Sequence, residues 1–228
     1  MEIKGLIETS FVDWPGRVCS VVFLGGCNFR CPFCHNHELV LNTGGLTGKP
    51  PAEVIARLKS FGDWLDGVVV SGGEPCLDPD LVSLCRGFLA AGLPVKIDTN
   101  GSRPGVVEEL LRENLLEAVS MDLKAPLDDE ILHRRLAGVT ADLEAVSRSI
   151  DLFLSSGIEV EFRTTVVPGL LTEEHLGKMA ERVKGATRYK INAFRPLTCL
   201  DKSFEKLPGL TDEEQKRFQD LVDSLIRP

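Results

Sequence analysis

Strand-like and helix-like patterns alternate along most of this chain, and this alternation limits the folds open to it. Six apolar runs rich in β-branched residues are predicted to be buried strands: 17–26, 67–73, 94–101, 117–126, 158–169 and 188–194. Stretches with helical spacing follow them: 51–65, 78–92, 104–115, 142–156, 172–185 and 211–226. Continuously apolar strands are typical of a parallel sheet covered by helices, so the pattern predicts an α/β fold. Six units are too few for a closed eight-unit barrel, which leaves an open, partial barrel or a doubly wound sheet.

Length and composition are those of an ordinary globular protein. The sequence shows no internal repeat or long linker, so we expect a single domain over residues 1–228, with its core at about 17–200 and a C-terminal helix at 211–226. The net charge of −8 argues against nucleic acid as a partner. No apolar run resembles a signal peptide or a membrane span, so we expect no membrane partner and a cytoplasmic location, where the seven cysteines stay reduced.

Glycine-rich and polar segments fall directly after the predicted strands. They are the cysteine-rich loop 25–36, SGGEP at 71–75, DTNG at 98–101, DLK at 122–124, Arg163 ahead of VVPG, and NAFRP at 192–196. In parallel α/β folds the chemistry sits at the carboxyl ends of the strands. We therefore expect these segments to share one rim and to form one site.

The loop GGCNFRCPFCHN carries three cysteines, Cys27, Cys31 and Cys34, at the spacing C-x3-C-x2-C. Thiolates are soft ligands that suit zinc and iron–sulfur clusters. A zinc site would need His35 or His37 as its fourth ligand, and the position of His35 next to Cys34 makes joint ligation of one ion awkward. A [4Fe–4S] cluster with one iron free of protein ligands is the favoured interpretation, since that iron can chelate a small molecule.

This motif, with Phe33 directly before its last cysteine, resembles that of the radical S-adenosylmethionine superfamily. The resemblance covers about residues 5–200 and implies a partial (βα)6 barrel of parallel strands with outer helices. It also implies that the three cysteines bind a [4Fe–4S] cluster whose open iron binds S-adenosylmethionine. GGEP resembles the superfamily's second motif, in which Gly72, Gly73 and Glu74 would meet the methionine ammonium of that cofactor.

Within the superfamily, the sequence is most similar to the activating enzymes of glycyl radical enzymes. DTNG, DLK and FRTTVVPG stand at the strand ends where that group has similar segments. The resemblance implies that Lys124 and Arg163 neutralise the carboxylate of S-adenosylmethionine. The residues it assigns to binding that cofactor, besides the GGE segment, are Phe33, Asp122, Lys124, Arg163 and Asn192. The residues it assigns to a monovalent cation are Asp98, Thr99 and Asp122.

The opening TSFVDWPGRV (9–18) and the CHN that ends the cysteine loop are similar to the short activating proteins of anaerobic ribonucleoside-triphosphate reductases. His37 and Cys76 depart from the residues usual in that group. The resemblance implies reductive cleavage of S-adenosylmethionine to a 5′-deoxyadenosyl radical. That radical would take a hydrogen atom from a glycine of a partner glycyl radical enzyme, such as anaerobic ribonucleotide reductase. A flavodoxin or ferredoxin-type protein would donate the electron, and Arg195 would lie on the rim that meets the cofactor or the partner's loop.

Two alternatives stay open on the sequence alone. One is a radical enzyme that acts on a small molecule, similar to 7-carboxy-7-deazaguanine synthase. The other is a non-catalytic iron–sulfur or zinc module. The scattered cysteines, which we interpret as small buried hydrophobes, are Cys19, Cys76, Cys85 and Cys199.

Overall fold

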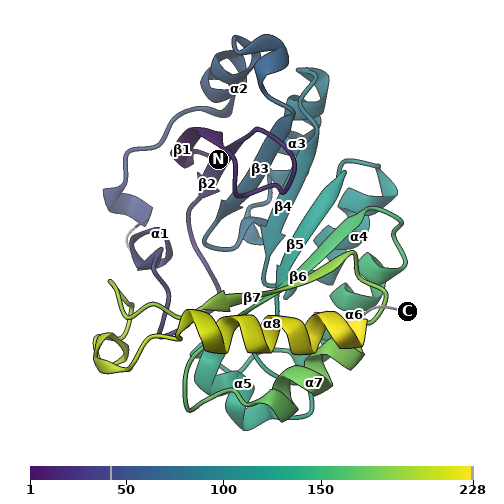
Figure 1. The fold of residues 1–228 in the computed structure, drawn as a ribbon. Coiled ribbons are helices and arrows are strands. Elements are labelled where there is room, and N and C mark those ends of the chain that lie inside the picture. The colour runs from purple at the N-terminus through teal and green to yellow at the C-terminus, as the bar shows by residue number, and fades with distance from the viewer. Residues whose placement is uncertain (42, 227–228) are drawn as a thin grey trace. The chain divides into compact units, whose positions relative to one another are not determined.

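The computed structural model describes residues 1–41 and 43–226 (Figure 1). Seven strands occur in this part of the chain: β1 (Ile3–Ser10), β2 (Cys19–Leu24), β3 (Gly67–Gly72), β4 (Val95–Thr99), β5 (Ala118–Asp122), β6 (Glu159–Val166) and β7 (Arg188–Ala193). Eight α-helices occur in the same part: α1 (His37–Leu41), α2 (Pro51–Lys59), α3 (Leu81–Ala90), α4 (Pro104–Arg112), α5 (Glu130–Ala137), α6 (Leu143–Leu154), α7 (Glu173–Arg182) and α8 (Asp212–Ile226). The order of strands in the sheet follows the chain, from β1 to β7, and the predicted α/β class is confirmed.

The chain forms two compact units whose segments alternate along the sequence. The first consists of Met1–Asn28, Asn36–Thr99 and Arg103–Val119, and the second of Phe29–His35, Asn100–Ser102 and the residues from Ser120 onward. A single domain over residues 1–228 stays a prediction. No helix in the described part of the chain has both the length and the apolar character needed to cross a membrane.

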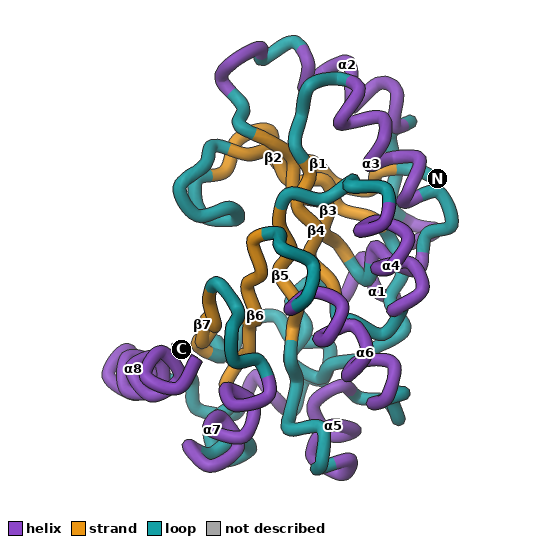
Figure 2. Tube along the Cα trace, turned by 90° about the vertical axis from the view of Figure 1, so that its right-hand side faces the viewer, coloured by secondary structure: helices purple, strands orange, loops and turns teal. Residues whose placement is uncertain are grey.

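The first unit contains a mixed sheet. Strand β1 lies antiparallel to β2, whereas β2, β3 and β4 are parallel, with Leu24 opposite Gly72 and Val68 opposite Val95. Helices α3 and α4 lie to one side of these strands (Figure 2). The sequence pattern does not predict β1, because most of its residues are half-exposed or exposed and form no continuous apolar run.

Trp14 anchors the core of the first unit. Its side chain is fully buried and packs against a cluster that includes Cys19, Val21 and Val69. A Cβ added to Gly67 at the start of β3 would lie 2.8 Å from the Trp14 ring. The strand can therefore lie this close to the indole only because residue 67 is glycine. The aromatic residue of the DWPG segment is therefore a packing residue.

The second unit is built on the parallel pair β6 and β7. Phe162 lies opposite Tyr189 and Thr164 opposite Ile191, and all four side chains are buried. The hydroxyl oxygen of Tyr189 lies 2.9 Å from Oγ1 of Thr164, which satisfies the polar end of a buried tyrosine. The alternate side chains of β6, including Arg163, point to the other face of the strand.

Helix α8 lies along β7 (Figure 1). Two of its glutamines, one helical turn apart, bind the free edge of this strand. The N–H of Ile191 donates to Oε1 of Gln219 at 2.8 Å, and Nε2 of Gln219 donates to the carbonyl oxygen of Tyr189 at 2.7 Å. Nε2 of Gln215 donates to the carbonyl oxygen of Ile191 at 2.7 Å. The side-chain amides thus replace the next strand of the sheet and satisfy backbone groups that would otherwise be open to another chain.

Replacing Gln219 with alanine should weaken this edge. The change removes two hydrogen bonds to the backbone of β7, and we expect the free energy of unfolding in urea to fall by roughly 1–3 kcal/mol. Asp220→Ala, at the neighbouring exposed position of α8, is the matched control and should change stability by less than about 0.5 kcal/mol. Equal effects of the two variants would show that the glutamine does not stabilise the edge.

Candidate active site

The first cysteine of the motif follows β2 through two glycines in the first unit. Gly26 has a φ of +88°, a left-handed conformation that glycine adopts without strain. Its N–H donates to the carbonyl oxygen of Leu39 at 2.8 Å, which ties the loop to helix α1. Cys27 is half-buried on this backbone-anchored loop.

The GGE segment at the end of β3 packs directly against the same loop. The N–H of Gly73 donates to the carbonyl oxygen of Leu24 at 3.0 Å, and the N–H of Glu74 donates to that of Gly26 at 2.8 Å. A Cβ added to Gly73 would lie 1.9 Å from the Gly26 carbonyl oxygen, and one added to Gly72 would lie 2.1 Å from that of Leu24. Since neither position has room for a side chain, the two motifs are held together through their backbones.

Glu74 is a buried carboxylate with a fixed orientation. It is only 1% exposed, and its Oε1 accepts hydrogen bonds from Oγ1 of Thr99 at 2.8 Å and from the N–H of Cys76 at 3.0 Å. Such charge-assisted bonds are what a carboxylate needs in order to stay buried. Burial, and then the neighbouring Glu74, raise the pKa of the Cys76 thiol well above its usual value. Cys76 therefore stays a neutral, buried thiol.

The other two cysteines, Cys31 and Cys34, belong to the second unit, where helix α5 supports their loop. The N–H of Cys34 donates to the carbonyl oxygen of Cys31 at 3.0 Å, and the N–H of Arg30 donates to that of Ala137 at 2.8 Å. Gly138, which ends α5 with a φ of +69°, lies so close that a Cβ on it would be 2.0 Å from the Arg30 carbonyl oxygen. The sequence pattern does not predict α5, yet its C-terminal end holds this part of the cysteine loop.

A charged triad in the second unit consists of Asp122 at the end of β5, Lys124 just beyond that strand, and Arg163 within β6. Nζ of Lys124 lies 3.1 Å from Oδ2 of Asp122, and Nε of Arg163 lies 3.0 Å from Oδ1. Burial would raise the pKa of Asp122, but the two cations outweigh it and the pKa is lowered. Burial would lower the pKa of Lys124, but Asp122 and then Cys31 outweigh it and the pKa is raised. The triad thus carries one net positive charge, which suits an anionic group of a ligand.

Phe33 and Cys31 lie beside this triad. Nζ of Lys124 is 5.8 Å from the centroid of the buried Phe33 ring, within the range of a cation–π contact. Burial raises the pKa of the Cys31 thiol, and Lys124 opposes that rise. Within the second unit, the predicted aromatic, thiol and cationic residues therefore do lie together.

Asn192 shares a face of the sheet with Arg163. It lies opposite Thr165, which is two residues beyond Arg163 on β6, so the three side chains point to the same side. Arg195 lies on the loop after β7. Its carbonyl oxygen is 3.1 Å from Nε2 of His35. His35 is exposed and contacts this backbone oxygen.

Asp98, a predicted cation ligand, lies near the end of β4 in the first unit beside a buried lysine. Nζ of Lys96 is 2.7 Å from Oδ1 of Asp98. The hydroxyl of Thr99, the next predicted ligand, donates a hydrogen bond to Oε1 of Glu74. The four scattered cysteines are free thiols and are buried, as their interpretation as small hydrophobes requires.

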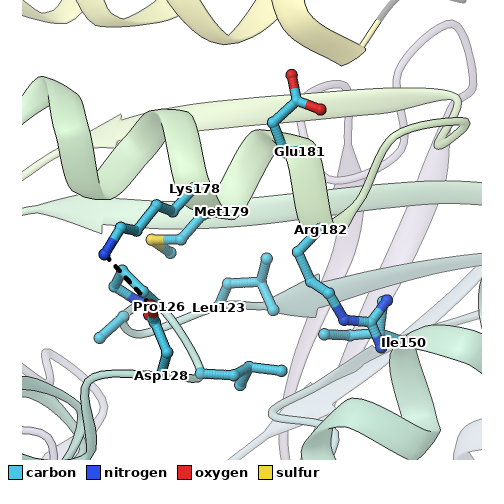
Figure 3. Close-up of a pocket in the computed structure, with 10 residues that line it drawn as sticks. Leu123, Pro126, Asp128, Ile150, Lys178, Met179, Glu181 and Arg182 are labelled. Atoms are coloured by element: carbon cyan, nitrogen blue, oxygen red, sulfur yellow. Dashed lines mark hydrogen bonds and ion pairs between the residues drawn. The ribbon is translucent and has the colours of Figure 1, made fainter.

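A hollow of about 460 Å³ lies among helices α6, α7 and the loop after β5 in the second unit (Figure 3). Its wall includes Leu123 and Ala125, on either side of Lys124 in the sequence, and its rim carries Lys178, 3.2 Å from Asp128. None of the residues predicted for the site lines this hollow. It is therefore separate from the candidate site.

Comparison with known protein families agrees with this geometry. Residues 21–183 match the family model of the Radical SAM superfamily. The matched range contains the cysteine motif, the GGE segment and the charged triad. The fold is that of a radical S-adenosylmethionine enzyme.

Individual relatives narrow the class further. A protein of Methanocaldococcus jannaschii, provisionally named a glycyl-radical enzyme activating enzyme, is 34% identical over 98% of this chain and 92% of its own. The pyruvate formate-lyase-activating enzyme of Clostridium pasteurianum is 28% identical over 98% of both chains. The crystal structure of SuiB from Streptococcus suis with bound S-adenosylmethionine has a TM-score of 0.69 at 18% identity, over 90% of this chain and 48% of SuiB, a likeness of fold. This chain belongs to the radical SAM superfamily and, within it, to the glycyl-radical enzyme activating enzymes.

Membership confirms the predicted partial barrel of the radical SAM type, the enzyme class, and the two cofactors, a [4Fe–4S] cluster and S-adenosylmethionine. The residues present fit these groups. Three thiols at the motif spacing suit iron, Glu74 offers a buried carboxylate to an ammonium, and the triad offers positive charge to a carboxylate. The particular contacts between residues and cofactors stay predictions.

Gly73→Ala tests the close approach of the two motifs. The added Cβ meets backbone, which cannot move aside as a flexible side chain can, so we expect a loss of unfolding free energy on the order of 3 kcal/mol. Iron and sulfide bound after anaerobic reconstitution should fall as well, because the Cys27 loop is displaced. Gly105→Ala in α4, where a Cβ meets nothing within 4 Å, is the matched control and should leave both measurements unchanged or raise stability.

His133 on α5 is a buried group that no sequence pattern singles out. It is 2% exposed, and its ring packs edge-on against Phe29 of the cysteine loop, with centroids 6.1 Å apart and an angle of 88°. Among the described residues its Nδ1 has no hydrogen-bond partner. Burial, and then the charge of Lys124, lower the pKa of His133 from 6.5 to about 4.

Acid should therefore destabilise the fold through His133. Between pH 6.5 and pH 4 the unfolded chain binds a proton that the folded chain excludes, so the free energy of unfolding falls as the pH falls, by up to about 3 kcal/mol. Urea unfolding at several pH values should show that the free energy of unfolding of His133→Leu falls less between pH 6.5 and pH 4 than that of the wild type. His175→Gln, at an exposed helix cap, should keep it. A wild-type pH slope in His133→Leu would contradict the assignment.

Proposed function

We propose that this enzyme activates a glycyl radical enzyme by removing a hydrogen atom from the Cα of one glycine in that partner protein. The observation that carries the proposal is the match along nearly the whole chain to the Methanocaldococcus jannaschii and Clostridium pasteurianum relatives, both named as activating enzymes. The segments TSFVDWPGRV and CHN support the finer assignment of the partner, an anaerobic ribonucleotide reductase.

The cysteine loop holds the cluster in this proposal, with Cys27, Cys31 and Cys34 as its ligands. When bound, the cluster and S-adenosylmethionine supply one-electron chemistry: reductive cleavage of a carbon–sulfur bond gives a 5′-deoxyadenosyl radical, which takes a hydrogen atom. The chain's own contribution is to bind the cofactor, to orient it and to keep water away from it. A backbone-anchored loop serves that purpose because its position does not depend on flexible side chains.

The groups that bind S-adenosylmethionine are assigned by charge and access. In this assignment the backbone of Gly72 and Gly73 meets the methionine ammonium, and Glu74 supplies a carboxylate whose orientation Thr99 fixes. Lys124 and Arg163 neutralise the cofactor's carboxylate, and Asp122 orients both cations. Phe33 packs against Lys124, and Asn192 lies on the same face of the sheet as Arg163. Each assignment is part of the proposal.

The proposal also includes an electron donor and a cellular compartment. A flavodoxin or ferredoxin-type protein donates the electron, since the reaction needs one-electron reduction at low potential. The proposed location is the cytoplasm, which keeps thiols reduced. None of the seven cysteines, all of which lie in the described part of the chain, forms a disulfide, as that location requires.

Incubation with a co-encoded glycyl radical enzyme tests the partner. Under anaerobic, reducing conditions the reaction should form 5′-deoxyadenosine and a glycyl radical, seen as a doublet in the electron paramagnetic resonance spectrum of the partner. Cofactor cleavage with turnover of a small molecule, and no doublet, would instead favour an enzyme acting on a small molecule.

Cys31→Ala should abolish the chemistry, because the loop loses one of its three proposed iron ligands. We expect reconstituted iron to drop and 5′-deoxyadenosine formation to fall by more than about 100-fold. The control is Cys85→Ala on α3, a fully buried thiol outside the proposed site, which should keep both the brown colour and cofactor cleavage. Full iron content and cleavage in Cys31→Ala would overturn the ligand assignment.

A further inference from the structure

Lys96 is a lysine inside the apolar strand β4. It is 2% exposed, and its neighbours Val95 and Ile97 are fully buried. Because side chains two residues apart on a strand point to the same face, Lys96 and Asp98 project together. A buried ammonium is costly unless an opposite charge and further acceptors surround it.

The surroundings of Lys96 meet that requirement within the first unit. Its Nζ donates to Oδ1 of Asp98 at 2.7 Å and to the carbonyl oxygen of Asp13 at 2.9 Å. The Asp13 carboxylate in turn accepts a hydrogen bond from Oγ of Ser10 at 2.5 Å. The side chain of Asp98 is 12% exposed, so little water competes with the ion pair.

This pair conflicts with the expectation of a monovalent cation on Asp98. The ammonium carries the same charge as such an ion and already lies at hydrogen-bonding distance from the carboxylate. A second cation on Asp98 would stand against Lys96 in a poorly hydrated place, where like charges repel strongly. In the second unit, the carboxylate of Asp122 likewise bonds both Lys124 and Arg163. The carboxylates present thus do not fit a metal cation.

We propose that Lys96 is a tethered counter-cation of Asp98 and that this enzyme needs no monovalent metal ion at that carboxylate. Lys96 does not touch the cofactor in this proposal; it is a positioning residue that fixes the carboxylate ahead of Thr99. Within the strand sequence VKIDT, Lys96 supplies the positive charge beside Asp98 that a free ion would otherwise supply from solution. With an apolar residue at position 96, Asp98 would be left without this cation.

The wild-type enzyme gives the first test. Melting of the full chain, and binding of S-adenosylmethionine to the cluster-loaded enzyme, should be measured in potassium, sodium and choline chloride at equal ionic strength. We expect melting temperatures that do not depend on the cation and affinities within about twofold of one another. Binding that is about tenfold tighter in potassium or sodium than in choline would overturn the proposal. Because melting needs no cofactor, this result is independent of the function proposed above.

The second test removes the lysine. Lys96→Met keeps the length of the side chain but leaves Asp98 without its counter-cation, so this variant should melt at a lower temperature and should regain stability in potassium or sodium but not in choline. The double variant Lys96→Met/Asp98→Asn removes both charges and should melt at the same temperature in all three salts. If the single variant responds to the cations no more than the double variant does, Asp98 does not depend on Lys96 for its charge and the proposal fails. If Lys96→Met does not fold, the wild-type measurements still decide.

Discussion

The contact on which the rest of the site depends is a backbone-to-backbone approach in the first unit. The parallel register places Leu24 level with Gly72, so the ends of β2 and β3 leave the sheet side by side. Gly73 then lies against the carbonyl oxygen of Gly26, and the next N–H donates to that same oxygen. Since no side chain takes part, the position of the Cys27 segment relative to Glu74 depends on backbone contacts within the first unit. An active site that binds a reactive cofactor gains from such rigidity.

Charge is arranged by one rule in both units. A lysine and an aspartate two residues apart in the sequence pair with each other: Lys96 with Asp98 on β4, and Lys124 with Asp122, the last residue of β5. The first pair is neutral, whereas Arg163 adds a cation to the second. Positive charge is therefore concentrated where Arg163 of β6 meets the end of β5, and a ligand carboxylate is expected there. Neutrality of the first pair leaves the buried Glu74 as the carboxylate suited to an ammonium.

The sequence predicts the parallel strands well, because strands buried on both faces must be apolar throughout. The sequence pattern does not predict elements that are only partly buried. Strand β1 lies at the edge of the sheet and is mostly half-exposed, so its residues mix apolar and charged types. Helix α5 buries only Leu132, His133, Leu136 and Ala137, a narrow stripe in which one member is a histidine. The glutamines of α8 look like surface residues, since only the placement of the helix beside β7 gives them backbone partners.

Some residues of the candidate site can likewise be recognised from the sequence, whereas others cannot. The cysteine spacing and the two glycines are visible in the sequence because iron and a close backbone approach each demand one residue type. The pairing of Arg163 with Asp122 spans 41 residues and depends on the register of separate strands, so no local pattern contains it. Lys96 is different. A lysine and an aspartate two apart within VKIDT share a face of a strand that is otherwise apolar, and a charge that cannot reach water must find its partner nearby. Their ion pair therefore follows from local sequence, and it argues against a metal ion on the same carboxylate before any tertiary contact is known.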